Sequence, residues 1–513
     1  MNLDSLSREL ENFLAASREA MVIEDGAVIF DLAAARYSIS AEHGKCLLHL
    51  WSSERNTVRR VLEAELHNDA LHLTVLRFGQ SRAVKLEVCR SRDRRSVAAK
   101  YAARAAYQQL LRRVLERDFP GYRLEGLTSA VDLERSFGPV YARGLLRRGQ
   151  SATAVLAVNA QETRASVDAA LTFGLLWLEQ CRQAGGRAHL EGLSLFVPPR
   201  TSDVVRARLA CLHRELARYT LFELDERAGE LQELDCSDRG NIATRLVHCP
   251  DRRSAEQRFA GSIGRVLALA PETDIAVLDP GEIAFRLHGL EFARARLASQ
   301  AGSFRNAEEI VFGLGAAETA LTGDTAAQFA ELTRRLLLAR HPGRGPQEPL
   351  WRACPERWLE SLVVGDVAAL DPRLEPACVY SQVPAFSASD RAMIDVLATT
   401  REGRLAVLEL KADEDIHLPL QGLDYWARVR WHQQRGEFKR FGYFPGRQIG
   451  PEAPLLLLVA PALHVHPATD TLLRYLSPDI DWELLAVDEH WRSGLRVVFR
   501  KHPEKKLAAD QRR

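Results

Sequence analysis

Two segments that lie far apart in the chain share one pattern of strand and helix. The segment "AVLAVNAQETRASVDAALTFGLLWLEQC", residues 154–181, aligns without a gap on "AVLELKADEDIHLPLQGLDYWARVRWHQ", residues 406–433. In both, an apolar run typical of a buried strand precedes apolar residues at helical spacing. A repeat of this kind constrains the fold, because both copies must form the same α/β unit. Two strand–helix segments can also resemble each other by chance, so the repeat is a hypothesis.

The domain organisation follows from length and pattern. The chain has 513 residues, which exceeds the usual size of one hydrophobic core and predicts several domains. Alternating apolar and polar residues predict a β-rich N-terminal domain over residues 1–95, with one short helix at "TVRRVLEAEL", residues 57–66. The repeat predicts α/β modules over residues 96–235 and 346–513, and residues 236–345 form a connecting region of mixed pattern. The expected fold class is multidomain α/β.

Three charged residues interrupt apolar runs in the second repeat copy. Asp395 lies in "IDVLATT", and Glu409 and Lys411 lie in "RLAVLELKA". Side chains alternate along a strand, so Glu409 and Lys411 face the same side, and a turn at "REG" can bring Asp395 close to Glu409. Burial and like charge both disfavour two ionised carboxylates, and a divalent cation such as Mg²⁺ or Mn²⁺ removes that penalty. The pattern indicates a metal site suited to phosphodiester hydrolysis, although Glu-x-Lys also occurs on solvated strands.

The arrangement resembles the PD-(D/E)XK nuclease superfamily. An acidic residue in a strand, a short hairpin and Glu-x-Lys at the end of the next strand are matched here by Asp395 and Glu409-Leu410-Lys411. Many members carry Gln-x-x-x-Tyr on the following helix, matched by Gln421 and Tyr425, and often a Glu on a preceding helix, matched by Glu360. One departure is Ile394, where many members have Pro. The resemblance covers roughly residues 350–501 and stays at the superfamily level.

The resemblance implies a fold and an activity for residues 346–513. The fold would be a restriction-endonuclease-like mixed sheet flanked by helices, and the activity a Mg²⁺- or Mn²⁺-dependent deoxyribonuclease in repair, recombination or defence. Asp395, Glu409 and the backbone carbonyl of Leu410 would hold the metal. Lys411 would act on the attacking water, and Gln421 would orient the lysine or a phosphate. Glu360 would complete the catalytic set.

The first repeat copy lacks these residues, which predicts a degenerate nuclease-like module. Under the gapless alignment, five residues stand where the second copy has Asp395, Glu409, Lys411, Gln421 and Tyr425; they are Arg143, Ala157, Asn159, Ala169 and Phe173. We expect this module to serve binding, dimer-like pairing or regulation.

A surface for nucleic acid must be local, because the formal net charge is only +1. Residues 77–113 are strongly basic and could contact phosphates, although a solvated helix face is the alternative. The candidate contact residues of the whole chain are Arg92, Arg94, Arg95, Tyr425, Arg428 and Arg430. DNA is the expected partner, and an RNA-directed nuclease stays open.

The cysteines and the absence of apolar spans favour the cytoplasm. Eight cysteines occur without a CxxC pair, which fits a reducing compartment. The first residues, "MNLDSLSRELENFLAASREA", have the spacing of an amphipathic helix rather than a signal peptide, and no membrane partner is expected. A protein partner or a homo-oligomer stays open. The alternative function is a non-catalytic nucleic-acid-binding or assembly scaffold with a nuclease-like fold.

Overall fold

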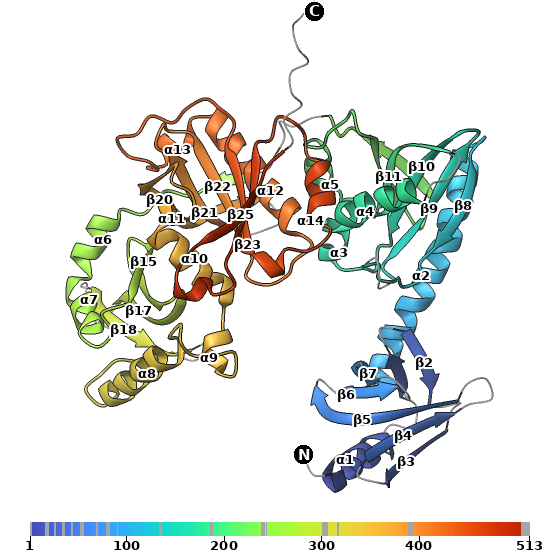
Figure 1. Ribbon diagram of the computed structural model, residues 1–513, viewed down its shortest axis with the longest axis horizontal. Coiled ribbons are helices and arrows are strands. Elements are labelled where there is room, and N and C mark those ends of the chain that lie inside the picture. The colour runs from blue at the N-terminus through green and yellow to red at the C-terminus, as the bar shows by residue number, and fades with distance from the viewer. Residues whose placement is uncertain are drawn as a thin grey trace, which may run out of the picture. The chain divides into compact units, whose positions relative to one another are not determined.

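The protein is described by a computed structural model, and four β-sheets organise it (Figure 1). By contact, the chain divides into one unit of Met1–Arg117 with Asn159–Gln161 and a second of Asp118–Val158 with Glu162–Arg513. The fold is a mixed α/β fold with several multistranded sheets. No helix among the described residues is long and apolar enough to cross a bilayer. The described residues are 3–503 except 16–19, 25–26, 33–35, 43–44, 52–55, 68–69, 78–82, 90, 133–135, 185–187, 238–241, 243, 300–305, 315–317 and 388–392. Only the backbone is described at 3–5, 9, 27–28, 31, 41–42, 45, 51, 56, 67, 77, 91–102, 299, 306–307 and 386–387.

The first unit is an antiparallel sheet with one helix on a face. The strand order is β2-β1-β7-β6-β5-β4-β3, and α1 buries Leu6, Leu10, Phe13 and Leu14 against the sheet. The elements are α1 (Leu3–Ala15), β1 (Met21–Glu24), β2 (Ala27–Asp31), β3 (Arg36–Glu42), β4 (Lys45–Trp51), β5 (Asn56–His67), β6 (Ala70–Arg77), β7 (Ala83–Cys89) and α2 (Ser91–Asp118).

The helix predicted at residues 57–66 is wrong, because this segment is strand β5. A β-bulge between Val61 and Glu63 adds one residue to β5 relative to β6. The bulge places the buried residues of this stretch, Val61 and Ala64, three positions apart. That spacing imitates the period of a helix, which explains the error.

The second unit contains a six-stranded sheet in the order β13-β12-β11-β10-β9-β8. Its three middle strands, β10, β11 and β12, are parallel, and the remaining pairs are antiparallel. The elements are β8 (Arg123–Thr128), β9 (Tyr141–Arg148), β10 (Ser151–Val158), α3 (Arg164–Asp168), α4 (Ala170–Gln183), β11 (His189–Val197), α5 (Asp203–Leu209), β12 (Arg218–Asp225) and β13 (Glu230–Leu234).

A seven-stranded sheet, β14-β20-β21-β22-β23-β24-β25, follows the same plan from β20 to β25. A hairpin leads into three parallel strands, β22, β23 and β24, and an antiparallel strand ends the sheet. Helix α12 connects β22 to β23 as α4 connects β10 to β11, so the topology agrees with the internal repeat. The elements are β14 (Thr244–Leu246), α9 (Pro349–Arg352), α10 (Pro355–Gly365), α11 (Val367–Leu370), β20 (Leu374–Ser387), β21 (Met393–Thr400), β22 (Leu405–Leu410), α12 (Leu418–Gln434), α13 (Glu437–Arg440), β23 (Leu455–Pro461), η2 (Ala462–His464), α14 (Thr469–Arg474), β24 (Trp482–Val487), η3 (Trp491–Ser493) and β25 (Val497–Lys501).

Helices cover both faces of the seven-stranded sheet. Alternate residues of β22 face opposite sides. Leu405 and Val407 belong to the apolar core that includes α12, and Ala406 and Leu408 belong to the core that includes α10 and α11. The six-stranded sheet contributes to the core around α12, because α4 and α5 pack beside α12 and α14 (Figure 1).

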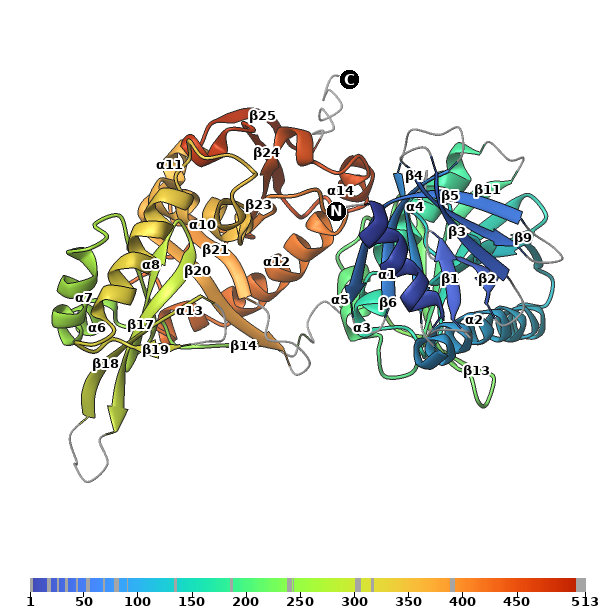
Figure 2. The same ribbon diagram turned by 90° about the horizontal axis from the view of Figure 1, so that it is seen from below.

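The connecting region forms a five-stranded antiparallel sheet, β15-β16-β17-β18-β19, with α8 in its apolar core. The sheet lies beside α10 (Figure 2), and at its β16–β17 turn a Cβ on Gly289 would come within 2.0 Å of the Arg357 carbonyl oxygen. Arg340 is fully buried and donates to four backbone carbonyls, those of Leu287, His288, Leu350 and Ala353. The elements are α6 (Arg252–Arg258), α7 (Ala260–Leu267), β15 (Asp274–Asp279), β16 (Glu282–Leu287), β17 (Leu290–Ser299), β18 (Asn306–Phe312), β19 (Thr319–Ala320) and α8 (Ala326–Ala339).

Candidate active site

The β21–β22 hairpin brings the two carboxylates of the sequence pattern together. Val396 pairs with Leu408, so the register continues with Asp395 opposite Glu409. The backbone N–H of Leu410, the last residue of β22, donates to Asp395 Oδ2 at 3.0 Å. Asp395 is therefore fixed against the end of β22, next to Glu409.

Burial and mutual repulsion dominate the electrostatics of this carboxylate pair. Glu409 is 2% exposed, and burial raises its pKa well above the ordinary value, with a further increase from the charge of Asp395 and a decrease from Lys411. Burial also raises the pKa of Asp395, although the Leu410 N–H and Lys411 act in the opposite direction. Glu409 Oε2 is buried and has no hydrogen-bond partner among the described residues. The pair therefore lacks full compensation of its negative charge.

Lys411 lies among three carboxylates. Its Nζ is 3.5 Å from Glu409 Oε1 and 3.7 Å from both Glu356 Oε1 and Asp415 Oδ2. Burial alone would lower the pKa of Lys411, but these carboxylates, Glu409 first, hold it above the ordinary value. Lys411 is therefore a cation and a hydrogen-bond donor at neutral pH.

Glu356 and Asp415 were not among the predicted site residues. Glu356 lies one turn before Glu360 on α10, and this i, i+4 spacing was a usable signal. Asp415 follows Lys411 in the acidic run "ADED", which had no spacing that distinguished it from a solvated loop.

Glu360 lies on α10 and is 5% exposed. Its Oε2 accepts hydrogen bonds from Arg357 Nη1 and from Gln382 Nε2, each at 2.8 Å. Burial raises the pKa of Glu360 to about 7; Arg357 lowers it and Asp395 raises it. Glu360 is therefore close enough to Asp395 for their charges to interact. Gln382, on β20, was not predicted, because nothing in its sequence context marks it.

Gln421 and Tyr425 lie one turn apart on α12, over the end of β22. Gly422 allows this approach, since a Cβ there would be 3.5 Å from Glu409 Cβ and within 2.5 Å of a leucine side chain of β23. Gln421 Oε1 is buried without a hydrogen-bond partner in the described part of the chain. Burial raises the pKa of Tyr425, and the charges of Glu409 and Asp395 raise it further. Helix α12 therefore places Tyr425 close enough to the carboxylate pair for its charges to act on the phenol, with Gln421 one turn before it.

Two of the arginines expected to contact nucleic acid, Arg428 and Arg430, form hydrogen bonds within the protein. Arg428 is 9% exposed, donates to the Ala385 carbonyl at 3.1 Å and lies 5.9 Å from the Tyr425 ring, so its guanidinium faces the interior. Arg430 donates to Gln433 Oε1 and to the Pro451 carbonyl, each at 2.9 Å. The other three candidate arginines, Arg92, Arg94 and Arg95, lie on α2, where only the backbone is described.

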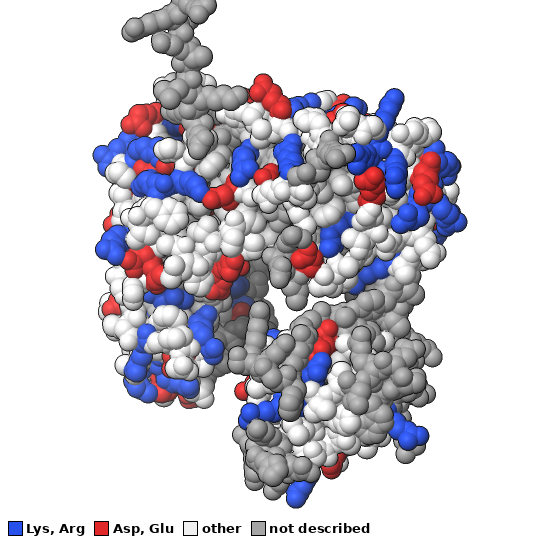
Figure 3. All heavy atoms as spheres, turned by 45° about the vertical axis from the view of Figure 1, so that its right-hand side comes forward, with Lys and Arg blue, Asp and Glu red and all other residues white. Residues whose placement is uncertain are grey.

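Charge is mixed rather than segregated on the surface in view. In Figure 3, Lys and Arg side chains are interspersed with Asp and Glu side chains over the described residues of that face. This mixture accords with the net charge of +1. A nucleic-acid surface on that face would therefore depend on a few local arginines and lysines.

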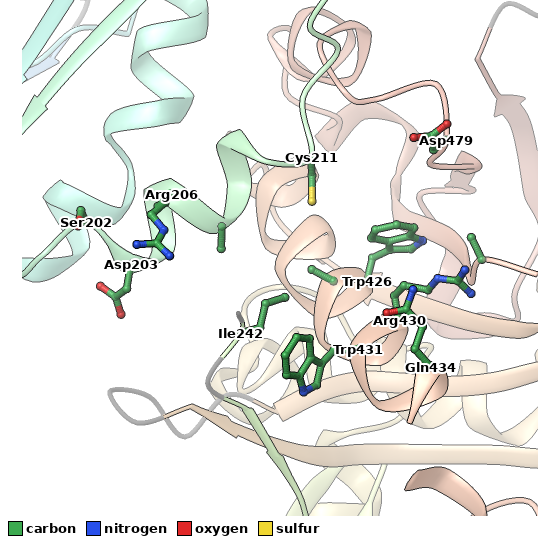
Figure 4. A pocket seen from close by; sticks show the side chains of 13 residues that line it. Ser202, Asp203, Arg206, Cys211, Ile242, Trp426, Arg430, Trp431, Gln434 and Asp479 are labelled. Atoms are coloured by element: carbon green, nitrogen blue, oxygen red, sulfur yellow. The ribbon is translucent and has the colours of Figure 1, made fainter. Parts of the chain in front are cut away.

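A cavity of about 470 Å³ lies between α5 and α12, away from the carboxylates. Figure 4 shows Arg206, Trp426, Arg430 and Trp431 around it. Its lining includes Ala453, which precedes β23 and so marks the opposite end of the parallel strands from Glu409. The cavity is therefore separate from the candidate active site.

The strand pairing corrects the predicted equivalence between the repeats. In each copy, the helix glycine lies against a leucine of the next parallel strand, Leu458 in the second copy and Leu195 in the first. Leu458 pairs with Glu409, whereas Leu195 pairs with Leu156. Leu156, and not Ala157, therefore takes the place of Glu409, and a one-residue slip would turn every side chain to the other face. By the same one-residue offset, Val158 rather than Asn159 is equivalent to Lys411.

The helix equivalence also shifts. Gly174 of α4 corresponds to Gly422 of α12, which places Phe173 and Trp177 where the second copy has Gln421 and Tyr425. The prediction of Ala169 at the glutamine position is wrong. The number of residues between the strand and the helix differs in the two copies, and a gapless alignment cannot represent that difference.

Arg143 keeps its predicted place opposite the Glu409 equivalent, since it pairs with Leu156. It is 4% exposed, donates to the Ala130 carbonyl at 2.7 Å and lies 5.7 Å from the Trp177 ring. An arginine and aromatic rings therefore fill, in the first copy, the space that carboxylates occupy in the second.

Comparison with known proteins assigns no family. No family model matches the chain, and no curated protein matches it. The function must be inferred from the chemistry of the site.

The donor set fits a divalent cation that prefers oxygen. The buried Glu409 Oε2 has no partner among the described groups, and the adjacent Asp395 raises the pKa of its carboxyl. Among the described residues, no three His, Cys, Asp or Glu side chains are arranged to hold a metal ion. The protein would thus supply two carboxylates, with remaining ligands from a backbone carbonyl, water or substrate, as is usual for Mg²⁺.

Proposed function

We propose that the chain is a metal-dependent nuclease that hydrolyses phosphodiester bonds in DNA, with its active site in the second α/β module. The observation that carries the proposal is the buried Asp395–Glu409 pair, whose free Glu409 oxygen lies at the end of the strand that leads into Lys411. Neither charge balance nor apolar packing explains such a pair, since it destabilises the metal-free protein.

The topology around the pair supports the resemblance to PD-(D/E)XK nucleases. The β21–β22 hairpin carries Asp395 and Glu409, and β22 continues through α12 into the parallel strands β23 and β24. A mixed sheet with helices on both faces is the arrangement that the resemblance implies. Gln421 and Tyr425 lie on α12, the helix that follows the Glu-x-Lys strand.

The residues have distinct roles in this proposal. Asp395, Glu409 and the Leu410 carbonyl would hold Mg²⁺ or Mn²⁺, and such an ion supplies a water of lowered pKa and stabilises charge on the phosphate. Lys411 is protonated, so it donates a hydrogen bond to the attacking water or to a phosphate oxygen. Glu360, with a pKa of about 7, is suited to accept a proton from that water near neutral pH. Gln421 orients Lys411 by accepting a hydrogen bond at its unpartnered amide oxygen, or orients a phosphate by donating from its amide nitrogen.

Cleavage assays test the proposal directly. Duplex, single-stranded and branched DNA, and RNA, are incubated with Mg²⁺, Mn²⁺ or EDTA and with wild-type, Lys411→Ala or Glu409→Gln protein. Lys439→Ala, which removes an exposed lysine of α13, is the matched control. We expect metal-dependent DNA cleavage that both site variants lose and the control keeps. Cleavage that persists in both site variants would mean that this site is not responsible for it and would overturn the proposal. Binding without cleavage under every metal would favour the scaffold alternative.

A further inference from the structure

Gln382 has an unusual backbone conformation for a strand residue. Its φ is +51°, in the left-handed region that a residue with a side chain adopts at a cost. Six non-glycine residues in the described part of the chain have positive φ, and Gln382 alone among them lies within a strand. Glycine would avoid this strain, so the side chain must offer something that a glycine would not.

The register places Gln382 next to the candidate active site. On either side of it, Ser381 pairs with Val396 and Val383 pairs with Ile394. Gln382 is thus at the ladder position opposite Asp395, the residue that lies against the Leu410 N–H. The left-handed turn of the backbone occurs at the one position of β20 that faces a candidate metal ligand.

The side chain of Gln382, on β20, forms a hydrogen bond with Glu360, on α10. Its Nε2 donates to Glu360 Oε2 at 2.8 Å, and Arg357 Nη1 donates to the same oxygen at 2.8 Å. Arg357 lies on the same helix as Glu360, so its bond fixes the carboxylate only relative to α10. The bond from Gln382 connects the carboxylate to β20 and hence to the sheet that carries Asp395.

We infer that Gln382 is a positioning residue that holds the Glu360 carboxylate toward Asp395. Backbone strain persists where the surrounding structure maintains it for a function, and the strain at Gln382 has this placement. The effect on a reaction rests on the proposed nuclease function, whereas the bond itself does not. Gln382 differs from the superfamily residues named above, because no motif position includes it.

Two substitutions separate strain from positioning. Gln382→Ala and Gln382→Gly both remove the amide, but only glycine relieves the left-handed backbone. We expect the glycine variant to melt at a higher temperature than the alanine variant, the reverse of the usual order within a strand. Both variants should lose kcat by about 10- to 100-fold with KM little changed, as for other residues that orient an active-site ligand.

Arg200→Gly is the matched control, since Arg200 has a φ of +62° in an exposed turn after β11. It should relieve strain without a change in kcat. If both Gln382 variants keep kcat while wild-type cleavage is metal-dependent, the positioning role is wrong. A glycine variant that melts below the alanine variant would equally overturn it, because no strain would then be present.

A substrate-free measurement separates this inference from the proposed function. The side-chain amide of Gln382 is followed by nitrogen-15 NMR in wild-type protein and in Glu360→Ala, with Gln382→Ala for assignment. A bonded amide should exchange slowly with solvent and shift when Glu360 is removed. If wild-type protein cleaves nothing but this signature is present, the nuclease proposal fails and the positioning of Glu360 stands. If the exchange rate and chemical shift of the amide are unchanged in Glu360→Ala, the inference is overturned, whatever the activity.

Discussion

Arg208 and Asp424 join the two repeat copies by a pair of parallel hydrogen bonds. Arg208 Nε lies 2.9 Å from Asp424 Oδ1, and Nη2 lies 2.7 Å from Oδ2. The pair connects α5 of the first copy to α12 of the second, one residue before Tyr425. The first copy therefore contributes to fixing the helix that carries Gln421 and Tyr425.

Arg208→Ala should destabilise the protein by about 3 kcal/mol, because it leaves the largely buried Asp424 carboxylate without its partner. Urea denaturation at neutral pH measures this loss. The double variant Arg208→Met with Asp424→Leu should lose much less than the sum of the single changes, since neither charge is then left alone. Additive losses would show that the two groups do not interact in solution.

Glu409→Gln should stabilise the metal-free protein. Burial and Asp395 raise the pKa of Glu409 in the folded state above its ordinary value of 4.5. Ionisation of Glu409 therefore opposes folding increasingly as the pH rises above 4.5. The advantage of Glu409→Gln should be absent in acid and reach about 1 kcal/mol or more at alkaline pH. Melting curves at several pH values measure it.

Added Mg²⁺ or Mn²⁺ should reverse this order, because a ligand that binds the folded state stabilises it. The melting temperature of wild-type protein should rise with metal, and that of Glu409→Gln should not. An equal rise in both proteins would place the ion elsewhere.

Glu360 should make stability depend on pH near neutrality. Its folded pKa of about 7 exceeds the ordinary value of 4.5, so its contribution is fully present below about 4.5 and is lost as pH rises through about 7. The difference amounts to about 3 kcal/mol at most. The free energy of unfolding of wild-type protein, measured relative to Glu360→Gln, should fall across this interval. A flat difference would mean that the carboxyl is more solvated than the structure shows.

Gly289→Ala should displace the β16–β17 turn from α10. Gly289 has a φ of +74°, and an added Cβ would lie within 2.0 Å of the Arg357 carbonyl oxygen. We expect a loss of roughly 2 kcal/mol or more in urea denaturation. Gly281→Ala, in the β15–β16 turn, meets only ordinary contacts and should be close to wild type. Equal losses in the two variants would show that the turn does not press on α10.

The sequence predicted the parts of the site that depend on local rules. Alternation along β22 and a short turn suffice to place Asp395 near Glu409, and helical spacing suffices to place Gln421 and Tyr425 on one face. Gln382 comes from an element distant in sequence, so the sequence alone gives no signal for its approach, whereas the i, i+4 spacing from Glu360 was a usable signal for Glu356.

The errors have equally local causes. The bulge near Val61 gave strand β5 a helical spacing. The β9–β10 turn joins Arg148 to Ser151 and is shorter than the β21–β22 turn, which joins Thr399 to Leu405. A gapless alignment cannot represent such differences in length, and it replaced Leu156 by Ala157 on the opposite face of the sheet.

The charge of Arg340 is compensated in a different way from those of Lys411 and Arg208, which pair with carboxylates. Its partners are four backbone carbonyl dipoles, and no salt bridge to a carboxylate is found for it in the described part of the chain. Mobile ions screen exposed ion pairs within a Debye length, but they do not reach a fully buried guanidinium. The attachment of the five-stranded sheet to α9 and to the residues before α10 should therefore tolerate high ionic strength.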